Sequence, residues 1–424
     1  EGQQVSSEKN LINNFLKADI HLGINATKLP RLARDFRKDY SSLRSIFVQS
    51  QQHMPIGGGK DLFPLNQRLI DSTTCLLMLC PDHATAWSDR KCALLLSKSW
   101  NDMDDDLIKV NQSVWKEEIS FLDMLFSQHS KAPNAWSHRK WICGQIVVNI
   151  KILPPGKTRV LVSSHTWGDL MHWARHEIEQ CIRVAEHFPK NYYAWTHRSF
   201  IIRTLIDLQT TDTPHNSDNT SNDLLLNLLQ EEVNSINPWL RRHVSDHSAA
   251  HYGGEVLRLL LRFGESGLKT NEDNISWKVK LIQEQLVESR RLALFFRSYE
   301  VLWIWRRICS QIFLGTLAEL SSRNTSSNSK TILTHAIHQF VDIDVNQTLE
   351  DCYCIVPSIA EDESQRCILH CNTYIMWVLE HFKRYNSYKL IENDYYLEEL
   401  EAKVSASLTT NDKISHNMWR KRVS

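Results

Sequence analysis

The chain has 424 residues, of which 42% are hydrophobic, while glycine and proline number only 13 and 11. This composition fits a large helical protein with a long continuous core. Its 49 basic and 49 acidic residues balance, which argues against a nucleic-acid backbone or an anionic membrane as the main partner. No stretch reaches the roughly 18–20 apolar residues of a membrane span and no secretory signal opens the chain, so we expect a cytoplasmic protein.

The first 65 residues precede the repeated part of the chain, and we expect them to form an N-terminal helical cap. Residues 66–320 are organised by four tetrapeptides of the form Trp-x-x-Arg and a degenerate copy at Ala250. Successive copies are roughly 50–60 residues apart, and a fixed period of this length is typical of stacked repeats. The tetrapeptides give the repeat tryptophans and repeat arginines: Trp87 and Arg90, Trp136 and Arg139, Trp195 and Arg198, Trp303 and Arg306.

A carboxylate shares the register of these tetrapeptides. It stands eighteen residues before the tryptophan position in three units, where Gln285 holds the same place in the last unit and Leu69 in the first. The first unit of a stack lacks a neighbour on one side, which explains its departure. The three repeat carboxylates are Glu118, Glu177 and Glu232.

Each unit has the pattern of a helical hairpin. Apolar residues recur every three or four positions before the break, as in Ile119, Leu122 and Phe126, and again after it. Proline beside Asn or Asp separates the two segments, as in Phe188-Pro-Lys-Asn191, and such a break ends one helix and caps the next. We therefore predict an all-α solenoid of antiparallel helical hairpins, with about five repeats and C-terminal capping helices.

Tryptophan and arginine three positions apart lie on one side of the second helix. We expect each repeat tryptophan to be buried between adjacent hairpins. We expect each repeat arginine to pair with the carboxylate on the preceding helix of its own unit, for example Arg198 with Glu177.

Composition marks the remaining boundaries. Residues 209–223 form a polar insert between the third and fourth units, and the serine-rich residues 321–331 are predicted to be a linker. Residues 332–424 contain further apolar-periodic segments, which we expect to form a C-terminal helical cap.

The string from Phe188 to Arg198, Phe-Pro-Lys-Asn-Tyr-Tyr-Ala-Trp-Thr-His-Arg, resembles the α-subunit repeat of protein prenyltransferases. The resemblance covers about residues 66–310. It implies the α subunit of a heterodimer that transfers a geranylgeranyl group to a cysteine near the C-terminus of a protein substrate. The family's β subunit carries the zinc and the isoprenoid diphosphate, so the resemblance implies no cofactor or metal on this chain and no activity without a β subunit. The expected partner is the β subunit of the Rab geranylgeranyltransferase, and the expected substrates include proteins that already carry a prenyl group.

The resemblance also implies a few candidate site residues. The family's lysine, five residues before the second tryptophan, corresponds to Lys131, whose ammonium would stabilise charge on the departing diphosphate. Ala132 and Pro133 replace the family's usual residues after this lysine. In the third unit Lys190, Asn191 and Tyr193 occupy the equivalent loop, where they are expected at the substrate and diphosphate rim.

Simpler interpretations stay open. Lys131 and Lys190 also fit ordinary solvated lysines, and His138 and His197 fit helix residues whose neighbours satisfy them. An alternative function is a tetratricopeptide-like interaction scaffold without transferase activity, although the period is well above 34 residues. A self-sufficient enzyme is disfavoured because the chain has no glycine-rich phosphate loop and no zinc-protease or nucleophile-elbow motif.

One cysteine cluster has the residue types of a metal site. Its members match no familiar zinc spacing, so buried core cysteines are the favoured interpretation. The cluster comprises Cys352, Cys354, Cys367, His370 and Cys371.

Overall fold

The computed structural model describes the chain from Phe15 to Ala402 with gaps. The described residues are 15–18, 21–24, 26–52, 63–96, 105–151, 164–211, 219–264, 271–323, 327–348, 350–351, 361–386 and 402. They form two compact units. Unit 1 comprises residues 1–166 with 182–184, and unit 2 comprises residues 167–181 with 185–424.

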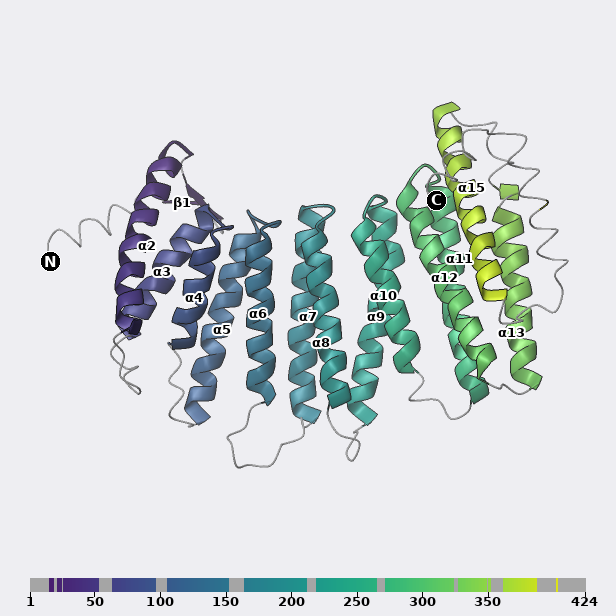
Figure 1. The fold of residues 1–424 in the computed structure, drawn as a ribbon, viewed down its shortest axis with the longest axis horizontal. Helices are drawn as coiled ribbons and strands as arrows, with labels where there is room; N and C mark the ends of the chain where they lie inside the picture. The colour runs from purple at the N-terminus through teal and green to yellow at the C-terminus, as the bar shows by residue number, and fades with distance from the viewer. Residues whose placement is uncertain are drawn as a thin grey trace. The chain divides into compact units, whose positions relative to one another are not determined.

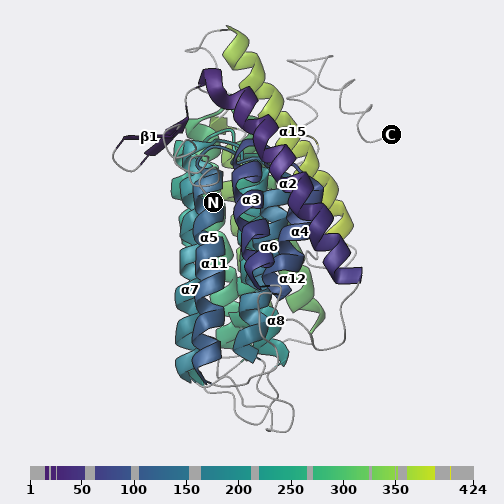
Figure 2. The ribbon, with the colours of Figure 1, turned by 90° about the vertical axis from the view of Figure 1, so that its left-hand side faces the viewer.

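Unit 1 opens with a short β hairpin. Strand β1 (Phe15–Ala18) pairs antiparallel with β2 (His21–Ile24), with Phe15 opposite Ile24. After the 3-10 turn η1 (Ala26–Lys28), helix α2 (Leu29–Gln52) packs against α3 (Phe63–Leu79), as Figure 2 shows. The segment predicted as an N-terminal helical cap therefore contains a strand pair ahead of its helix.

Two helical hairpins complete unit 1. Helix α3 pairs with α4 (Ala84–Leu96), and α5 (Asp105–Phe126) pairs with α6 (Pro133–Lys151) (Figure 1). Helix α4 also packs against α6. The second helices of successive hairpins are thus neighbours, as they are in a stack of repeats.

Unit 2 continues the same architecture. Its hairpins are α7 (Ser164–His187) with α8 (Tyr192–Thr211), α9 (Asn219–Arg242) with α10 (His247–Phe263), and α11 (Asn271–Phe295) with α12 (Glu300–Ser322). Their short turns lie at the same end of this unit in Figure 1. Helix α13 (Ser327–Gln339), the π-helix η4 (Phe340–Asn346) and α15 (Glu361–Asn386) follow; α13 packs against α11, and α15 against α12.

The predicted fold class is confirmed. Apart from the β1–β2 pair, the regular elements of the described residues are helical, and the five hairpins coincide with the five units read from the sequence. None of the described helices combines the length and the apolar character that crossing a bilayer requires.

The repeat tryptophans stabilise the hairpin turns. The indole Nε1 atoms of Trp87, Trp136 and Trp303 donate to backbone carbonyls six residues earlier, at 2.7, 2.8 and 2.9 Å. The ring is buried while its one polar atom satisfies a carbonyl at the end of the preceding helix, where carbonyls lack helical partners. These three tryptophans therefore fix the turns of their own hairpins. Trp195 differs, because its Nε1 donates to Asp246 Oδ2 in the next hairpin turn at 3.0 Å.

The predicted boundaries hold only in part. Helix α8 ends at Thr211 and α9 begins at Asn219, so the centre of the 209–223 insert lies outside the described residues. The linker predicted for 321–331 is wrong at its C-terminal end, because α13 begins at Ser327. Serine and asparagine suggested a loop there, but the same residues are favoured at helix starts. Of the cap predicted for 332–424, residues 387–401 and 403–424 lie outside the described part.

Candidate functional site

The repeat tryptophans, arginines and carboxylates are all buried. Trp303 and Arg306 are 1% and 0% exposed, and Glu177 is 0% exposed. Charged groups are costly in an apolar interior unless they are paired. The partners of these groups therefore show which helices the repeated residues hold together.

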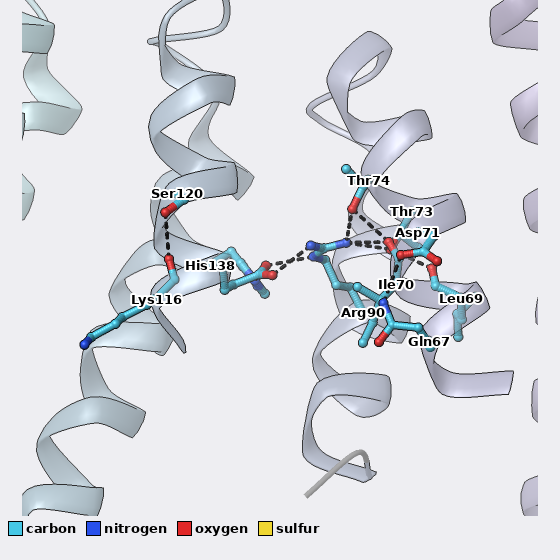
Figure 3. A network of polar contacts seen from close by, with 11 residues as sticks. Gln67, Leu69, Ile70, Asp71, Thr73, Thr74, Arg90, Lys116, Ser120 and His138 are labelled. Atoms are coloured by element: carbon cyan, nitrogen blue, oxygen red, sulfur yellow. Dashed lines mark hydrogen bonds and ion pairs between the residues drawn. The ribbon is translucent and has the colours of Figure 1, made fainter. Parts of the chain in front are cut away.

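In unit 1 the network is centred on Arg90. Its Nε and Nη2 donate to the two carboxylate oxygens of Glu118, each at 2.7 Å. Its Nη1 donates to the hydroxyls of Thr73 and Thr74 at 3.0 and 2.8 Å, as seen in Figure 3. This bidentate arginine–carboxylate geometry is the strongest form of such a pair. Arg90 thus joins α3, α4 and α5.

His138 completes this network from the other side of Glu118. Its Nε2 lies 2.7 Å from Glu118 Oε1. Burial would raise the pKa of Glu118, but Arg90 and His138 outweigh it and hold that pKa at about 2. Burial lowers the pKa of His138, although Glu118 opposes the shift. The neutral ring with its proton on Nε2 fits these contacts, because Nδ1 is buried without a hydrogen-bond partner and is then only an acceptor.

Unit 2 repeats the arrangement. Arg198 Nε donates to Glu232 Oε2 at 2.6 Å, and the hydroxyl of Tyr252 donates to the same carboxylate oxygen. Burial and Glu232 raise the pKa of Tyr252, which keeps its proton on the phenol. His197 Nε2 lies 3.0 Å from Glu177 Oε2.

These contacts correct the predicted pairing. Arg198 was expected to pair with Glu177 of its own hairpin, but it pairs with Glu232 of the next one, as Arg90 does with Glu118. The carboxylate also bonds to a residue of its own hairpin, and this residue stands two positions after the tryptophan position of that hairpin. This third-position residue is His138, His197 or Tyr252 in units two to four.

Helix geometry explains the error. Tryptophan and arginine, three apart, share the side of the second helix that faces the following hairpin, whereas the third-position residue is rotated by about 100°. The ring contacts agree with this orientation. The ring centroids of Trp87 and His138 lie 4.6 Å apart, and those of Trp195 and Tyr252 lie 5.3 Å apart. Glu118 and Glu232 therefore each bridge two hairpins, held by the arginine of one and the third-position residue of the other. Arg139 differs, because it pairs with Asp123 on the preceding helix of its own hairpin.

The junction between the fourth and fifth units lacks both charges. Gly253 stands where the fourth unit would have its arginine, and Gln285 replaces the following carboxylate. Trp305 Nε1 donates to Asn237 Oδ1 at 2.9 Å, and Asn237 Nδ2 donates to Gln285 Oε1 at 2.9 Å. A buried carboxylate at residue 285 would have no repeat arginine to neutralise it, so the amide is the compatible choice.

At the first and last repeats, other residues take the places of the repeat arginines and carboxylates. In the first unit Asp89 accepts hydrogen bonds from Tyr40 at 2.6 Å and Arg44 at 2.8 Å, both on α2. At the C-terminal end Arg306 Nη2 donates to Thr348 Oγ1 at 2.7 Å, and its guanidinium lies 4.7 Å from the centre of the Tyr374 ring. Thr348 and Tyr374 take the places of carboxylate and third-position residue.

The helical residues 327–348 and α15 therefore occupy the place that a following hairpin has in the other repeats. Sequence reasoning missed it because neither Thr348 nor Tyr374 belongs to the Trp-x-x-Arg pattern. The interpretation of His138 and His197 as helix residues satisfied by neighbours agrees with their contacts to Glu118 and Glu177, but the equivalent position of Tyr252 was not recognised. Their common place two residues after the tryptophan position was the available signal.

The hairpin turns carry the candidate residues implied by the family resemblance. In unit 1 Lys131 is exposed in the turn before α6, while the following Ala132 is buried and Pro133 begins the helix. In unit 2 Lys190 is exposed in the α7–α8 turn with φ of 60°. Asn191 is buried, and its side-chain oxygen accepts a hydrogen bond from the Ala194 amide at 3.3 Å.

Asn191 is thus an N-terminal helix cap, because its side-chain oxygen already accepts a hydrogen bond from the first turn of α8. Tyr193 is half-buried, whereas its neighbour Tyr192 is 63% exposed. Tyr192 was not among the candidates, although it follows the same Pro-Lys-Asn string. The lysines and Tyr192 are the groups of these turns that solvent or a partner reaches.

The cysteine cluster is only partly within the described residues. Cys367 and Cys371 lie one turn apart on α15 and are each 1% exposed, and His370 is half-buried with its pKa lowered by burial. Cys352 and Cys354 lie outside the described residues.

Buried ion pairs that solvent does not reach hold hairpins together; they offer no reactive group to a substrate. The chemistry available to a ligand in this part of the fold is that of exposed turn lysines and tyrosines. The class defined by these features is a stack of helical hairpins with buried Trp-x-x-Arg signatures and exposed lysines in the turns.

Comparison with known proteins gives this class its name. Residues 115–146 and 174–205 match the model described as the protein prenyltransferase alpha subunit repeat. The chain carries repeats of this family, and the resemblance found in the sequence is confirmed.

Particular relatives share these repeats. The chain is 26% identical over 293 residues to protein prenyltransferase alpha subunit repeat-containing protein 1-A of Xenopus laevis, covering 64% of this chain and 61% of that protein. It is 26% identical over 263 residues to protein prenyltransferase alpha subunit repeat-containing protein 1 of Homo sapiens, covering 56% of this chain and 58% of that protein. The alignments span about three fifths of these relatives.

Proposed function

We propose that this chain is the α subunit of a heterodimeric protein prenyltransferase. In this proposal the enzyme transfers a geranylgeranyl group to a cysteine near the C-terminus of a protein substrate. The β subunit of the Rab geranylgeranyltransferase is the proposed partner, and it would carry the zinc and the geranylgeranyl diphosphate.

One observation carries the proposal. Both segments that match the prenyltransferase alpha subunit repeat contain a hairpin turn with an exposed lysine, Lys131 in the first and Lys190 in the second. An exposed turn lysine at a subunit contact is free to approach an anion bound by the partner. The buried parts of the same repeats supply a rigid support for these turns.

The proposed division of labour follows from the chemistry. Bond cleavage places negative charge on the departing diphosphate, and a fixed cation beside it lowers the barrier. Lys131 is the proposed source of that cation, with Lys190 and Tyr193 at the rim. Asn191 contributes by fixing the start of α8 rather than by contacting the substrate.

Co-expression with candidate β subunits tests the proposal. A stoichiometric complex on gel filtration that transfers a geranylgeranyl group, with neither subunit active alone, would support it. A chain that remains a solitary monomer with every candidate would overturn it and favour the interaction scaffold. Transfer by the isolated chain would also contradict it.

A further inference from the structure

One side of α7 presents two histidines with a carboxylate before and after them. His172 and His176 stand four positions apart, Asp169 precedes the first by three positions, and Glu179 follows the second by three. All four residues are exposed. Residues three or four positions apart lie on the same side of a helix, so these four form one surface, which we call the α7 histidine face.

The residues of this face are available to a ligand. In the described part of the chain, Asp169, His172 and Glu179 make no ion pair or hydrogen bond through their side chains. Arg175 is the only arginine or lysine between Asp169 and Glu179, and its Nη2 donates to Glu231 Oε1 on α9 at 3.0 Å. The charge of Arg175 is therefore compensated, and the face keeps two carboxylates beside its histidines.

A second pair of exposed histidines on α10 lacks this setting. His247 and His251 are also four positions apart. The preceding Asp246 is buried and accepts hydrogen bonds from two indoles and the Ala249 amide. The following Glu255 accepts hydrogen bonds from Ser199 and Arg203. No carboxylate next to this pair is left for a cation, so the α7 pair is the better candidate for a metal site.

We propose that the α7 histidine face binds one zinc ion. Neutral imidazole is a preferred ligand of zinc, and two histidines four positions apart on a helix bind the same ion. Helical side chains lean toward the N-terminus, which directs Glu179 toward His176 and makes it the third ligand. The same lean directs His172 toward Asp169, whose carboxylate would accept the proton of the ring nitrogen that does not bind zinc.

Binding requires rotation of side chains and no movement of the helix. In the structure the ligand atoms of this face are not gathered around one point. The helix nevertheless sets the Cβ atoms of His172 and His176 about 5–6 Å apart. Because both side chains are exposed, their rotation displaces no core residue. Water would complete a tetrahedral site that keeps one open position.

This ion is separate from the zinc that the proposed β subunit would carry. The family resemblance implies no metal on this chain, and the α7 histidine face takes no part in the pairing of arginines with carboxylates. The proposal therefore does not depend on prenyl transfer, and its test uses this chain alone.

Isothermal titration calorimetry of the full chain with zinc chloride tests the proposal, after alkylation of exposed thiols such as Cys92. The wild type should bind an ion that the double variant His172→Gln with His176→Gln binds at least roughly tenfold more weakly, because glutamine does not replace imidazole as a ligand. Glu179→Gln should weaken binding less, since both histidines remain.

The matched control is His247→Gln with His251→Gln on α10, which removes the same number of exposed histidines and should keep zinc affinity within about twofold. Without zinc, all variants should keep the wild-type melting midpoint because the substituted residues are exposed. With zinc, the midpoint should rise for the wild type and the control but not for the α7 double variant.

An affinity that the α7 double variant leaves unchanged, equal weakening by the control, or no zinc binding by the wild type would overturn the proposal. The cobalt-loaded chain gives an independent readout, because thiolate ligands add an intense charge-transfer band that imidazole and carboxylate ligands do not. A spectrum dominated by that band would assign the ion to cysteines and would also overturn the proposal.

Discussion

At the scale of single residues, the repeat carboxylates Glu118 and Glu232 each hold two hairpins together. Glu232 receives Arg198 from one hairpin and Tyr252 from the next, and all three are at most 4% exposed. Removing one member of a buried pair costs more than the pair contributes, because the remaining charge loses its compensation. The arginine is therefore the most sensitive point for a test.

Arg198→Ala should destabilise the chain by roughly 3–5 kcal/mol, since it leaves Glu232 buried beside Tyr252 alone. Urea unfolding followed by circular dichroism measures the loss. Adding Glu232→Gln should recover part of it, because the amide carries no charge. Arg203→Ala is the control: its partner Glu255 is also a carboxylate, but Arg203 is 65% exposed and the expected cost is below ~1 kcal/mol. Equal losses for Arg198→Ala and Arg203→Ala would contradict the buried-pair account.

The buried, neutral His138 should make the stability of the fold depend on pH. Burial lowers its folded-state pKa below the usual value of 6.5. As pH falls through 6.5 the unfolded chain therefore takes up a proton that the folded chain does not, and stability decreases. The lowered pKa of Glu118 acts in the same direction from about pH 4.5 down to about pH 2.

Between pH 7.5 and 5.5, His138→Gln should therefore lose less thermal stability than the wild type, by roughly 2–4 °C in melting midpoint. Glutamine retains an amide donor for Glu118 but does not titrate in this range. His172→Gln, an exposed site on α7, is the matched control and should follow the wild type. A parallel decrease in all three proteins would show that His138 is not the titrating group.

At the scale of the element, periodicity and spacing were enough to predict the hairpins. The steps between Trp-x-x-Arg motifs located all five second helices, and proline-containing breaks located several of the turns. Pairing was not predictable in the same way, because it depends on which side of a helix meets the next hairpin. Arg198 and His197 are adjacent in sequence, yet they bond to carboxylates of different hairpins.

The candidate site residues stay predictions, because the structure gives their surroundings and not a bound substrate. Lys131 and Lys190 were identified through the family resemblance, and their exposure agrees with an accessible role. The sequence alone does not separate an accessible residue from a structural one in the same loop. Asn191, expected at the substrate rim, is buried and caps α8, and the adjacent exposed Tyr192 was not among the candidates.

Helix α10 shows how packing replaces the missing arginine. A Cβ atom added at Gly253 would lie 2.8 Å from Ile236 Cγ2 and 3.0 Å from Trp305 Cζ3. Glycine at this position leaves room for the Trp305 ring against α10. In this place Trp305 Nε1 donates to Asn237, the hydrogen bond that begins the neutral network. Gly253 at the arginine position and Gln285 at the carboxylate position therefore depend on each other, because together they leave no unpaired charge at this junction.

Gly253→Ala should therefore destabilise the chain by about 1–3 kcal/mol through overpacking, even though alanine favours the helix by about 1 kcal/mol. Gly144→Ala on α6 is the matched control, because nothing lies within 4 Å of its added Cβ. It should stabilise by about 0.5–1 kcal/mol. Denaturant midpoints measure both changes, and a stabilising Gly253→Ala would show that Trp305 moves aside freely.

At the scale of the whole molecule, the repeats of both units bury their tryptophans, arginines and carboxylates, and the candidate lysines of the described residues lie exposed in the turns. If the chain acts within a prenyltransferase heterodimer, most substitutions should impair assembly or stability, and few should change the rate of transfer. The turn lysines are the exceptions, since they are exposed and take no part in the buried networks described above. They separate an α subunit that only supports its partner from one that shares in the reaction.

Lys131→Ala should leave the affinity for the β subunit nearly unchanged and slow transfer by roughly 10- to 1,000-fold, the range for removing one charge-stabilising donor. The loss should appear in the rate more than in substrate affinity, because charge on the diphosphate grows only as the bond breaks. Single-turnover transfer with preassembled heterodimer measures it, and Lys190→Ala should have the smaller effect. Lys140→Ala, exposed on α6 beyond the turn, is the control and should react at the wild-type rate. If Lys131→Ala also reacts at that rate, Ala132 and Pro133 direct this turn away from the diphosphate, and the contribution of the chain to the enzyme is architectural.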